Sequence, residues 1–149
     1  MFEVKKMRRE ALRRQLPALI DYFASNDDIL TVYLFGSYGT NRYIPTLSDL
    51  DLAIIFGSDK TLMEEMKISA DISSLLERDD VDVLNLNKAR VDLGHEVIST
   101  GEIIYEKERL KTADFVERTL QHYFDYGIPL KIMREEFLET LKGETAPDD

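Results

Sequence analysis

Apolar positions recur along the chain with two different periods, and each period predicts one kind of element. Helical spacing, with apolar residues three or four positions apart, predicts helices over residues 3–25, 61–77 and 88–100. Shorter runs of β-branched and apolar residues predict four strands, at residues 29–35, 49–56, 81–86 and 102–106. The last third returns to the helical period in two segments, 112–126 and 131–143, separated by the break Gly127-Ile128-Pro129.

This order of elements predicts one domain. Helices are interspersed with strands, so the expected fold class is α/β (α+β), a small mixed β-sheet with helices packed on it and a helical C-terminus. The domain should occupy residues 1–142, and the acidic end, residues 143–149, should be disordered. Pro17 predicts a kink inside the first helix. Gly101 should end the helix over residues 88–100.

Composition narrows the classes of function. The 149 residues include 29 acidic and 19 basic side chains, a formal net charge of −10, which disfavours direct binding of nucleic acid. There is no cysteine, which excludes disulfides and cysteine-bound zinc, and His95 and His122 are the only histidines. No apolar run reaches the length of a membrane span, and the N-terminal stretch lacks the apolar core of a signal peptide. A cytoplasmic location without membrane contact is therefore expected.

Basic side chains concentrate in the first predicted helix. Two interpretations remain open for them: the solvated side of a helix, or a surface that meets an acidic partner or nucleotide phosphates. The residues are Lys5, Lys6, Arg8, Arg9, Arg13 and Arg14.

Two aspartates open the second predicted strand. Because side chains alternate between the faces of a strand, Asp49 and Asp51 share one face while the apolar residues between and after them share the other. Two carboxylates at about 7 Å, the spacing of residues i and i+2, repel each other and favour a cation between them. Oxygen ligands of this kind suit Mg²⁺. The alternative is a pair of exposed aspartates that cap a turn.

A third carboxylate, Asp82, stands in the apolar third strand. A charge in such a run indicates ion pairing or metal ligation, and a solvent-facing residue on an edge strand is the alternative. If Asp82 converges with Asp49 and Asp51, the three acids form a frame for two-metal phosphoryl or nucleotidyl transfer, with the metals about 3.5–4 Å apart.

The pair Gly36-Ser37 ends the first predicted strand. Glycine lets the backbone approach a ligand closely, and the backbone N–H and hydroxyl of Ser37 can bind a phosphate oxygen. A Gly-Ser pair alone is weak evidence, because such pairs end many strands. Here the pair is followed by an eleven-residue spacer, an Asp-x-Asp strand start and the later Asp82. This combination strongly indicates a phosphate-handling site.

Gly36-Ser37, the eleven-residue spacer, Asp49-x-Asp51 and the later Asp82 together resemble the nucleotidyltransferase superfamily of DNA polymerase β-like enzymes. Within it the chain is similar to the minimal nucleotidyltransferases, the MntA-type antitoxins that pair with HEPN-domain toxins. The resemblance covers most of the chain and implies a nucleotidyltransferase fold. It runs through the stretches SDLDLAI, VDVLNLNKA, EVISTGEIIYE and ADFVERTLQHYFDY.

The resemblance also implies a role for each matching residue. Gly36 and Ser37 would hold the β- and γ-phosphates of ATP as co-substrate. Asp49 and Asp51 would ligate Mg²⁺, with two ions expected. Asp82 would complete the metal site and help to deprotonate the acceptor hydroxyl.

The chain departs from the family pattern in the loop after Ser37. The spacer to Asp49 is one residue longer than usual, and Tyr38, Gly39 and Thr40 stand where the family often carries an arginine. Arg42 either takes over that role and grips a phosphate or is a solvated loop residue.

The resemblance implies that the protein transfers AMP to a tyrosine hydroxyl of a cognate HEPN toxin, in a reaction that depends on ATP and Mg²⁺. This modification would silence the toxin. The alternatives are a binding-only antitoxin with a vestigial nucleotide site and a Mg²⁺-dependent phosphohydrolase. Aromatic and apolar residues of the C-terminal helices either contact that partner or cover the sheet. They are Phe115, Tyr123, Phe124, Tyr126, Phe137 and Leu138.

Overall fold

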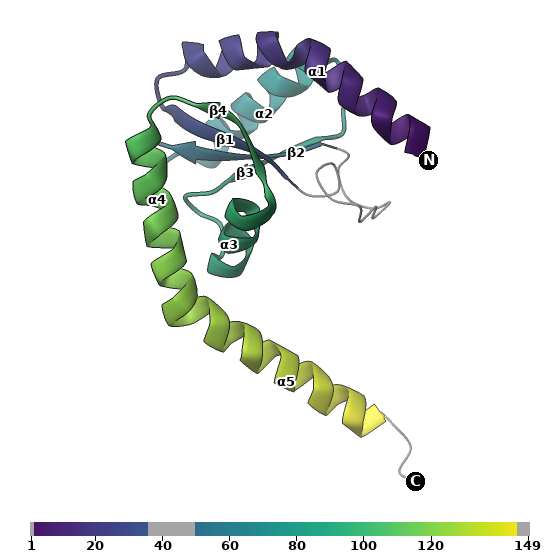
Figure 1. Ribbon diagram of the computed structural model, residues 1–149, viewed down its shortest axis with the longest axis vertical. Helices are drawn as coiled ribbons and strands as arrows, with labels where there is room; N and C mark the ends of the chain where they lie inside the picture. The colour runs from purple at the N-terminus through teal and green to yellow at the C-terminus, as the bar shows by residue number, and fades with distance from the viewer. Residues whose placement is uncertain (1, 36–49, 146–149) are drawn as a thin grey trace.

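The computed structural model describes residues 2–35 and 50–145 of the chain. A four-stranded sheet stands at its centre, with helices packed on both faces (Figure 1). The strands are β1 (Ile29–Phe35), β2 (Leu50–Phe56), β3 (Val81–Asn85) and β4 (Glu102–Glu106). The helices are α1 (Phe2–Ser25), α2 (Leu62–Leu76), α3 (Val91–Thr100), α4 (Arg109–His122), the π-helical turn η2 (Tyr123–Gly127) and α5 (Ile128–Thr145). Within these described ranges, no helix is both long and apolar enough to cross a membrane.

The strands lie in the order β3-β2-β1-β4. β1 is antiparallel to both β2 and β4, whereas β2 and β3 are parallel and are joined by a crossover through α2. This mixed sheet with its helices confirms the predicted fold class. Each described strand begins and ends within one residue of its predicted range.

The two faces of the sheet bury different residues, because side chains alternate along β2. Leu50, Leu52 and Ile54 are fully buried and pack with α1 and α2 in one core cluster. Ala53 and Ile55 point to the opposite face, in a second cluster against which α3 and α4 pack. All of β2 and nearly all of β1 are therefore buried, as predicted for strands covered on both faces.

Local chemistry explains where the inner helices begin and end. α2 starts with a capping box, in which Thr61 and Glu64 each accept the other's backbone N–H at 3.2 Å. Gly101 is the C-cap of α3, as predicted. A side chain does not fit at this position, because a Cβ would lie 2.5 Å from the carbonyl oxygen of Val97. α1 runs as one helix through Pro17.

The predicted break at Gly127-Ile128-Pro129 is wrong, because helical backbone continues from α4 through η2 into α5. Pro129 is tolerated as the second residue of α5, immediately after the wider π-helical turn. Gly127 is required there, since a Cβ would lie 2.5 Å from the ring of Tyr123. α5 extends to Thr145, into the stretch predicted to be disordered, and residues 146–149 lie outside the described part.

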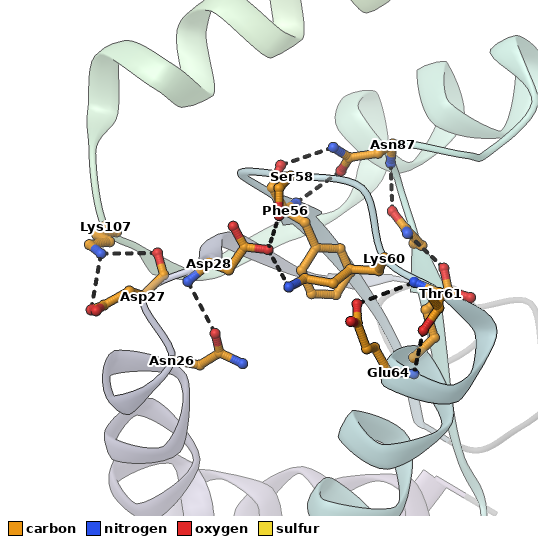
Figure 2. A network of polar contacts seen from close by, with 12 residues as sticks. Asn26, Asp27, Asp28, Phe56, Ser58, Lys60, Thr61, Glu64, Asn87 and Lys107 are labelled. Carbon is orange, nitrogen blue, oxygen red and sulfur yellow. Dashed lines mark hydrogen bonds and ion pairs between the residues drawn. The ribbon is translucent and has the colours of Figure 1, made fainter.

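A polar network anchors the C-terminal end of β2 (Figure 2). The carboxylate of Asp28 accepts a hydrogen bond from Ser58 Oγ at 2.8 Å and pairs with Lys60 Nζ at 2.5 Å. The side-chain amide of Asn87 bonds both the N–H and the C=O of Phe56 at 2.9 Å. The loop after β2 is thereby tied to the segment before β1 and to the loop after β3.

A buried hydroxyl pair joins α4 to the sheet and gives a first prediction. Thr31 and Thr112 are buried, and their hydroxyl oxygens lie 2.6 Å apart. Thr112→Val should cost about 1–3 kcal/mol of unfolding free energy, because it leaves the fully buried Thr31 hydroxyl without its partner. Thr31→Val on its own should cost less, since Thr112 Oγ1 also donates to the Glu108 carbonyl at 3.3 Å. The measurement is urea unfolding.

The double variant Thr31→Val/Thr112→Val tests the reason for that cost. Replacing both partners by apolar groups of the same shape removes the orphaned hydroxyl, so the double variant should be more stable than Thr112→Val alone. A double variant that is no more stable than the Thr112→Val protein would contradict this interpretation.

Asp28 gives a second prediction, which concerns pH. Burial opposes its ionisation, but hydrogen bonds from Lys60 and Ser58 outweigh burial and hold the pKa of the Asp28 carboxyl below its usual value of 3.8. Because the folded pKa is the lower one, this contribution to stability is present above pH 3.8 and is lost as pH falls through the folded value. Asp28→Asn should therefore destabilise the protein at about pH 7, and the difference from wild type should shrink toward about pH 3.

Chemical unfolding at several pH values measures this difference. The control is Asp59→Asn, which removes an exposed carboxylate from the same loop. An Asp28→Asn deficit that stays constant across the acid range would show that the carboxylate charge is not its cause.

Candidate active site

The register of three strands places two of the predicted site residues side by side. Asp51 is the second residue of β2, where it lies opposite Phe35 of β1 and in register with Asp82 of β3. Residues in register on neighbouring parallel strands point to the same face, and the strands are about 4.8 Å apart. The sheet therefore brings Asp51 and Asp82 together, as the prediction for these two residues requires.

Both carboxylates belong to the face of the sheet toward which α3 and α4 pack. Asp51 shares this face with Ala53 and Ile55, whereas its neighbours Leu50 and Leu52 point into the core beneath α1 and α2. Asp51 is 7% exposed, whereas Asp82 is exposed because β3 is an edge strand. A nearly buried carboxylate thus stands beside one that solvent and an incoming molecule can reach.

The remaining predicted site residues lie outside the described residues. These are Gly36, Ser37, Arg42 and Asp49. Their covalent neighbours are described: Phe35, which precedes Gly36, is in register with Asp51, and Leu50, which follows Asp49, begins β2. Their proposed roles remain predictions.

The chemistry of the two adjacent carboxylates fits a hard divalent cation. Mg²⁺ takes oxygen ligands and commonly uses one or two carboxylates together with phosphate oxygens. Two carboxylates on neighbouring strands also repel each other, which a cation between them relieves. In the part of the chain that the structure describes, no group of three or more histidine or acidic residues could hold a metal ion. A site built on Asp51 and Asp82 therefore needs a further ligand, the role predicted for Asp49.

A separate cavity of about 640 Å³ opens at the other end of the same sheet face. Ile55 lines it, four residues along β2 from Asp51, or about 13 Å at the rise of a strand. One face of α4, including Lys111, Arg118 and His122, forms its wall. This cavity was not predicted from the sequence. Lys111, Arg118 and His122 are seven and four positions apart, a spacing that places them on one helix face. The cavity is distinct from the Asp51–Asp82 site.

The base of α5 is fixed against α3 by two side-chain contacts. The rings of His95 in α3 and Tyr123 in η2 stack at 3.6 Å between centroids and 5° between planes. Arg134 Nη1 donates to Asp92 Oδ2 at 3.1 Å. Burial opposes ionisation of Asp92, but this bond from Arg134, with the backbone N–H of Leu93, keeps the pKa of its carboxyl below the usual range.

The mixed sheet and its helices have the fold of a nucleotidyltransferase, and comparison with protein families agrees. The chain belongs to the family described as Polymerase beta, Nucleotidyltransferase, whose model matches residues 18–110, more than half of the chain. This range contains all four strands and every predicted site residue, and it ends before η2 and α5. A search of curated proteins finds no match.

Solved structures show the same fold. A toxin–antitoxin MntA–HepT crystal structure is 19% identical with a TM-score of 0.65, covering 87% of this chain and 98% of that one. A tri-AMPylated Shewanella oneidensis HEPN toxin in complex with MNT antitoxin is 20% identical with a TM-score of 0.58, covering 95% and 99%. A toxin–antitoxin structure with AMP-PNP is 18% identical with a TM-score of 0.60, covering 93% and 98%. The predicted nucleotidyltransferase fold is confirmed.

The candidate site predicts a metal-dependent gain in stability. A cation that binds only the folded state stabilises it by on the order of 1–3 kcal/mol at about 10–100 times its Kd. Adding Mg²⁺ should therefore raise the melting temperature of the wild-type protein, and Asp51→Asn and Asp82→Asn should lose most of that increase.

Asp59→Asn is the matched control, because it removes an exposed carboxylate from the opposite end of β2 and should keep the full Mg²⁺ effect. The measurement is thermal unfolding followed by circular dichroism over a Mg²⁺ titration. An equal rise in wild type and Asp51→Asn would rule out a metal site at this carboxylate.

Proposed function

We propose that the protein is an ATP- and Mg²⁺-dependent nucleotidyltransferase that transfers AMP to a hydroxyl of a partner protein, a HEPN toxin, and thereby acts as its antitoxin. The observation that supports this most directly is the register of Asp51 and Asp82 on adjacent strands, in a chain of the nucleotidyltransferase family. The two carboxylates supply the oxygen ligands that the chemistry needs, at a point where the sheet edge is open to an acceptor.

In the proposed reaction, the acceptor oxygen attacks the α-phosphorus of ATP, a new oxygen–phosphorus bond forms, and pyrophosphate leaves as the bond to its bridging oxygen breaks. Asp51 and Asp82, with Asp49, would hold Mg²⁺, which neutralises charge on the triphosphate when bound. The exposed Asp82 would also receive the proton of the acceptor hydroxyl.

The loop after β1 would hold the other end of the nucleotide. Gly36 and Ser37 would bind the β- and γ-phosphates through backbone N–H groups and a hydroxyl, and Arg42 would add a positive charge. Such a reaction depends on positioning and charge neutralisation, so no histidine is needed for it.

A protein is the proposed acceptor because Asp82 is exposed on the edge strand β3, and neither Asp51 nor Asp82 lines the large cavity. The large cavity lies at the other end of the sheet face, about 13 Å along β2 from Asp51. A tyrosine hydroxyl carried on a partner's surface can approach the exposed Asp82. The structural likeness to a complex that contains a tri-AMPylated HEPN toxin supports the same class of acceptor.

The test uses the purified protein, Mg²⁺, α-labelled ATP and the protein encoded beside it in its genome. Label should appear on that neighbour, and Asp51→Asn should lower the initial rate by about 10²–10³-fold, the cost of removing one group that stabilises charge in a transition state. Asp59→Asn should transfer at the wild-type rate.

Two outcomes separate the alternatives. Neutralisation of the partner that persists in Asp51→Asn, with no label transferred by wild type, would favour a binding-only antitoxin with a vestigial site. Release of inorganic phosphate from ATP without labelled protein would favour a phosphohydrolase.

A further inference from the structure

Helix α5 carries a stripe of exposed apolar side chains. The α5 stripe consists of Met133, Phe137, Leu138 and Leu141, which are 65%, 63%, 50% and 42% exposed. Their spacing of four, five and eight residues from Met133 places them along one side of the helix. Contiguous exposed apolar residues of this kind mark interaction surfaces more often than scattered ones do.

The structure separates the apolar residues of the C-terminal helices into two groups. The apolar residues of the C-terminal helices were expected either to cover the sheet or to contact a partner, and the structure divides them. Phe115 packs against the second core cluster and Tyr123 stacks on His95. Phe137 and Leu138 remain exposed and do not cover the sheet.

α5 is held at its base and projects from the domain. It continues directly from η2, and the Arg134–Asp92 bond together with the Tyr123–His95 stack fixes where it leaves the body. Figure 1 shows α5 running away from the sheet below α3, with its far end on the side of the view where β2 begins. An 18-residue helix is about 27 Å long, enough to offer a neighbouring helix several turns of contact.

The position of α5 relates its stripe to the catalytic carboxylates. Asp51 and Asp82 point to the face of the sheet that α3 and α4 cover, and α5 extends from that same side. The exposed residues Leu62 and Met63, by contrast, lie on α2, which packs on the opposite face. A protein seated on α5 is therefore on the same side of the sheet as the carboxylates, whereas one seated on the start of α2 is on the opposite side.

Charge favours a different protein as the occupant over a second copy of this chain. Two copies with a formal net charge of −10 each repel one another, whereas a partner with a basic surface is attracted. The helical period of the stripe fits a partner helix by side-chain interdigitation. α5 also lies outside the segment that the nucleotidyltransferase family shares, so partner choice can be built into it without altering the catalytic core.

We propose that the α5 stripe docks the acceptor protein, a helical partner with a basic surface, and holds its hydroxyl near Asp51 and Asp82. This inference rests on the proposed transfer reaction and names the element that selects its acceptor. Docking at a second point makes the approach of the hydroxyl an intramolecular event with a raised effective concentration. The stripe thus controls the concentration dependence of transfer and takes no part in the chemistry.

The experiment replaces apolar contacts in two matched pairs of exposed positions. The test variant is Met133→Lys/Phe137→Lys in the α5 stripe, and the control is Leu62→Lys/Met63→Lys at the start of α2. The probe is the protein encoded beside this chain in its genome. Titration calorimetry gives the Kd, and labelled-ATP assays over a range of probe concentrations give KM and kcat. Circular dichroism melts establish that each variant is folded, and Met133→Ser/Phe137→Ser replaces the test variant if its melting temperature falls.

The stripe variant should weaken binding and raise the KM for the probe at least about tenfold, with kcat nearly unchanged at saturation. The α2 control should match wild type in both. Unchanged Kd and KM in the stripe variant would overturn the inference, as would failure of the probe to bind wild type. A wild-type dimer that becomes a monomer in the stripe variant, measured by light scattering, would show a second copy to be the occupant and would also overturn it.

Failure of the proposed function gives a different pattern. Asp51→Asn should bind the probe with the wild-type Kd and transfer label about 10²–10³-fold more slowly than wild type. If wild type binds through the stripe but transfers nothing, the reaction is wrong and the docking surface stands. If transfer proceeds with a normal KM in the stripe variant, the reaction stands and the docking surface is wrong.

Discussion

The register between β2 and β3 is the constraint on which the site depends. A strand exposes alternate residues to opposite faces, so a slip of one residue in β2 would turn Asp51 into the core beneath α1 and α2 and bring Leu50 to the site. Leu50, Leu52 and Ile54 are fully buried there, and burying a carboxylate in their place costs several kcal/mol. The hydrophobic core therefore sets the position of the Asp51 carboxylate at the candidate site.

Two aspartates of the protein show how surroundings separate a structural carboxylate from a functional one. Asp28 is satisfied internally by Ser58 and Lys60, and its charge serves to hold the end of β2. Asp82 faces solvent on an edge strand beside a second carboxylate, with no hydrogen bond or ion pair found to it among the described residues. The first arrangement lowers the energy of the folded chain, whereas the second raises local charge repulsion that an external cation can relieve. An exposed carboxylate beside a second one, as at Asp82, is where a metal ion and substrate phosphates are expected.

The molecule has two parts, the segment matched by the nucleotidyltransferase family and the helix α5 beyond it. The strands and the predicted site residues lie in the segment shared with the nucleotidyltransferase family, and α5 lies beyond it. The wider π-helical turn of η2, buried at Gly127 against Tyr123, joins the two parts without a loop. Helical continuity, the His95–Tyr123 stack and the Arg134–Asp92 bond together set the direction in which α5 leaves the domain.

The sequence by itself determined the class of fold and the four strands, because apolar periodicity and strand alternation are local properties that residue order encodes directly. It could not determine which strands are neighbours, that β3 lies at an edge, or that Asp82 is in register with Asp51, because these follow from long-range packing. The predicted break at Gly127-Ile128-Pro129 was wrong for the same reason. A π-helical turn packed on α3 accommodates a glycine and a proline that usually end a helix. Only the tertiary structure decided that Phe115 packs against the core while Phe137 is exposed, since both belong to amphipathic helices and only one of those helices meets the sheet.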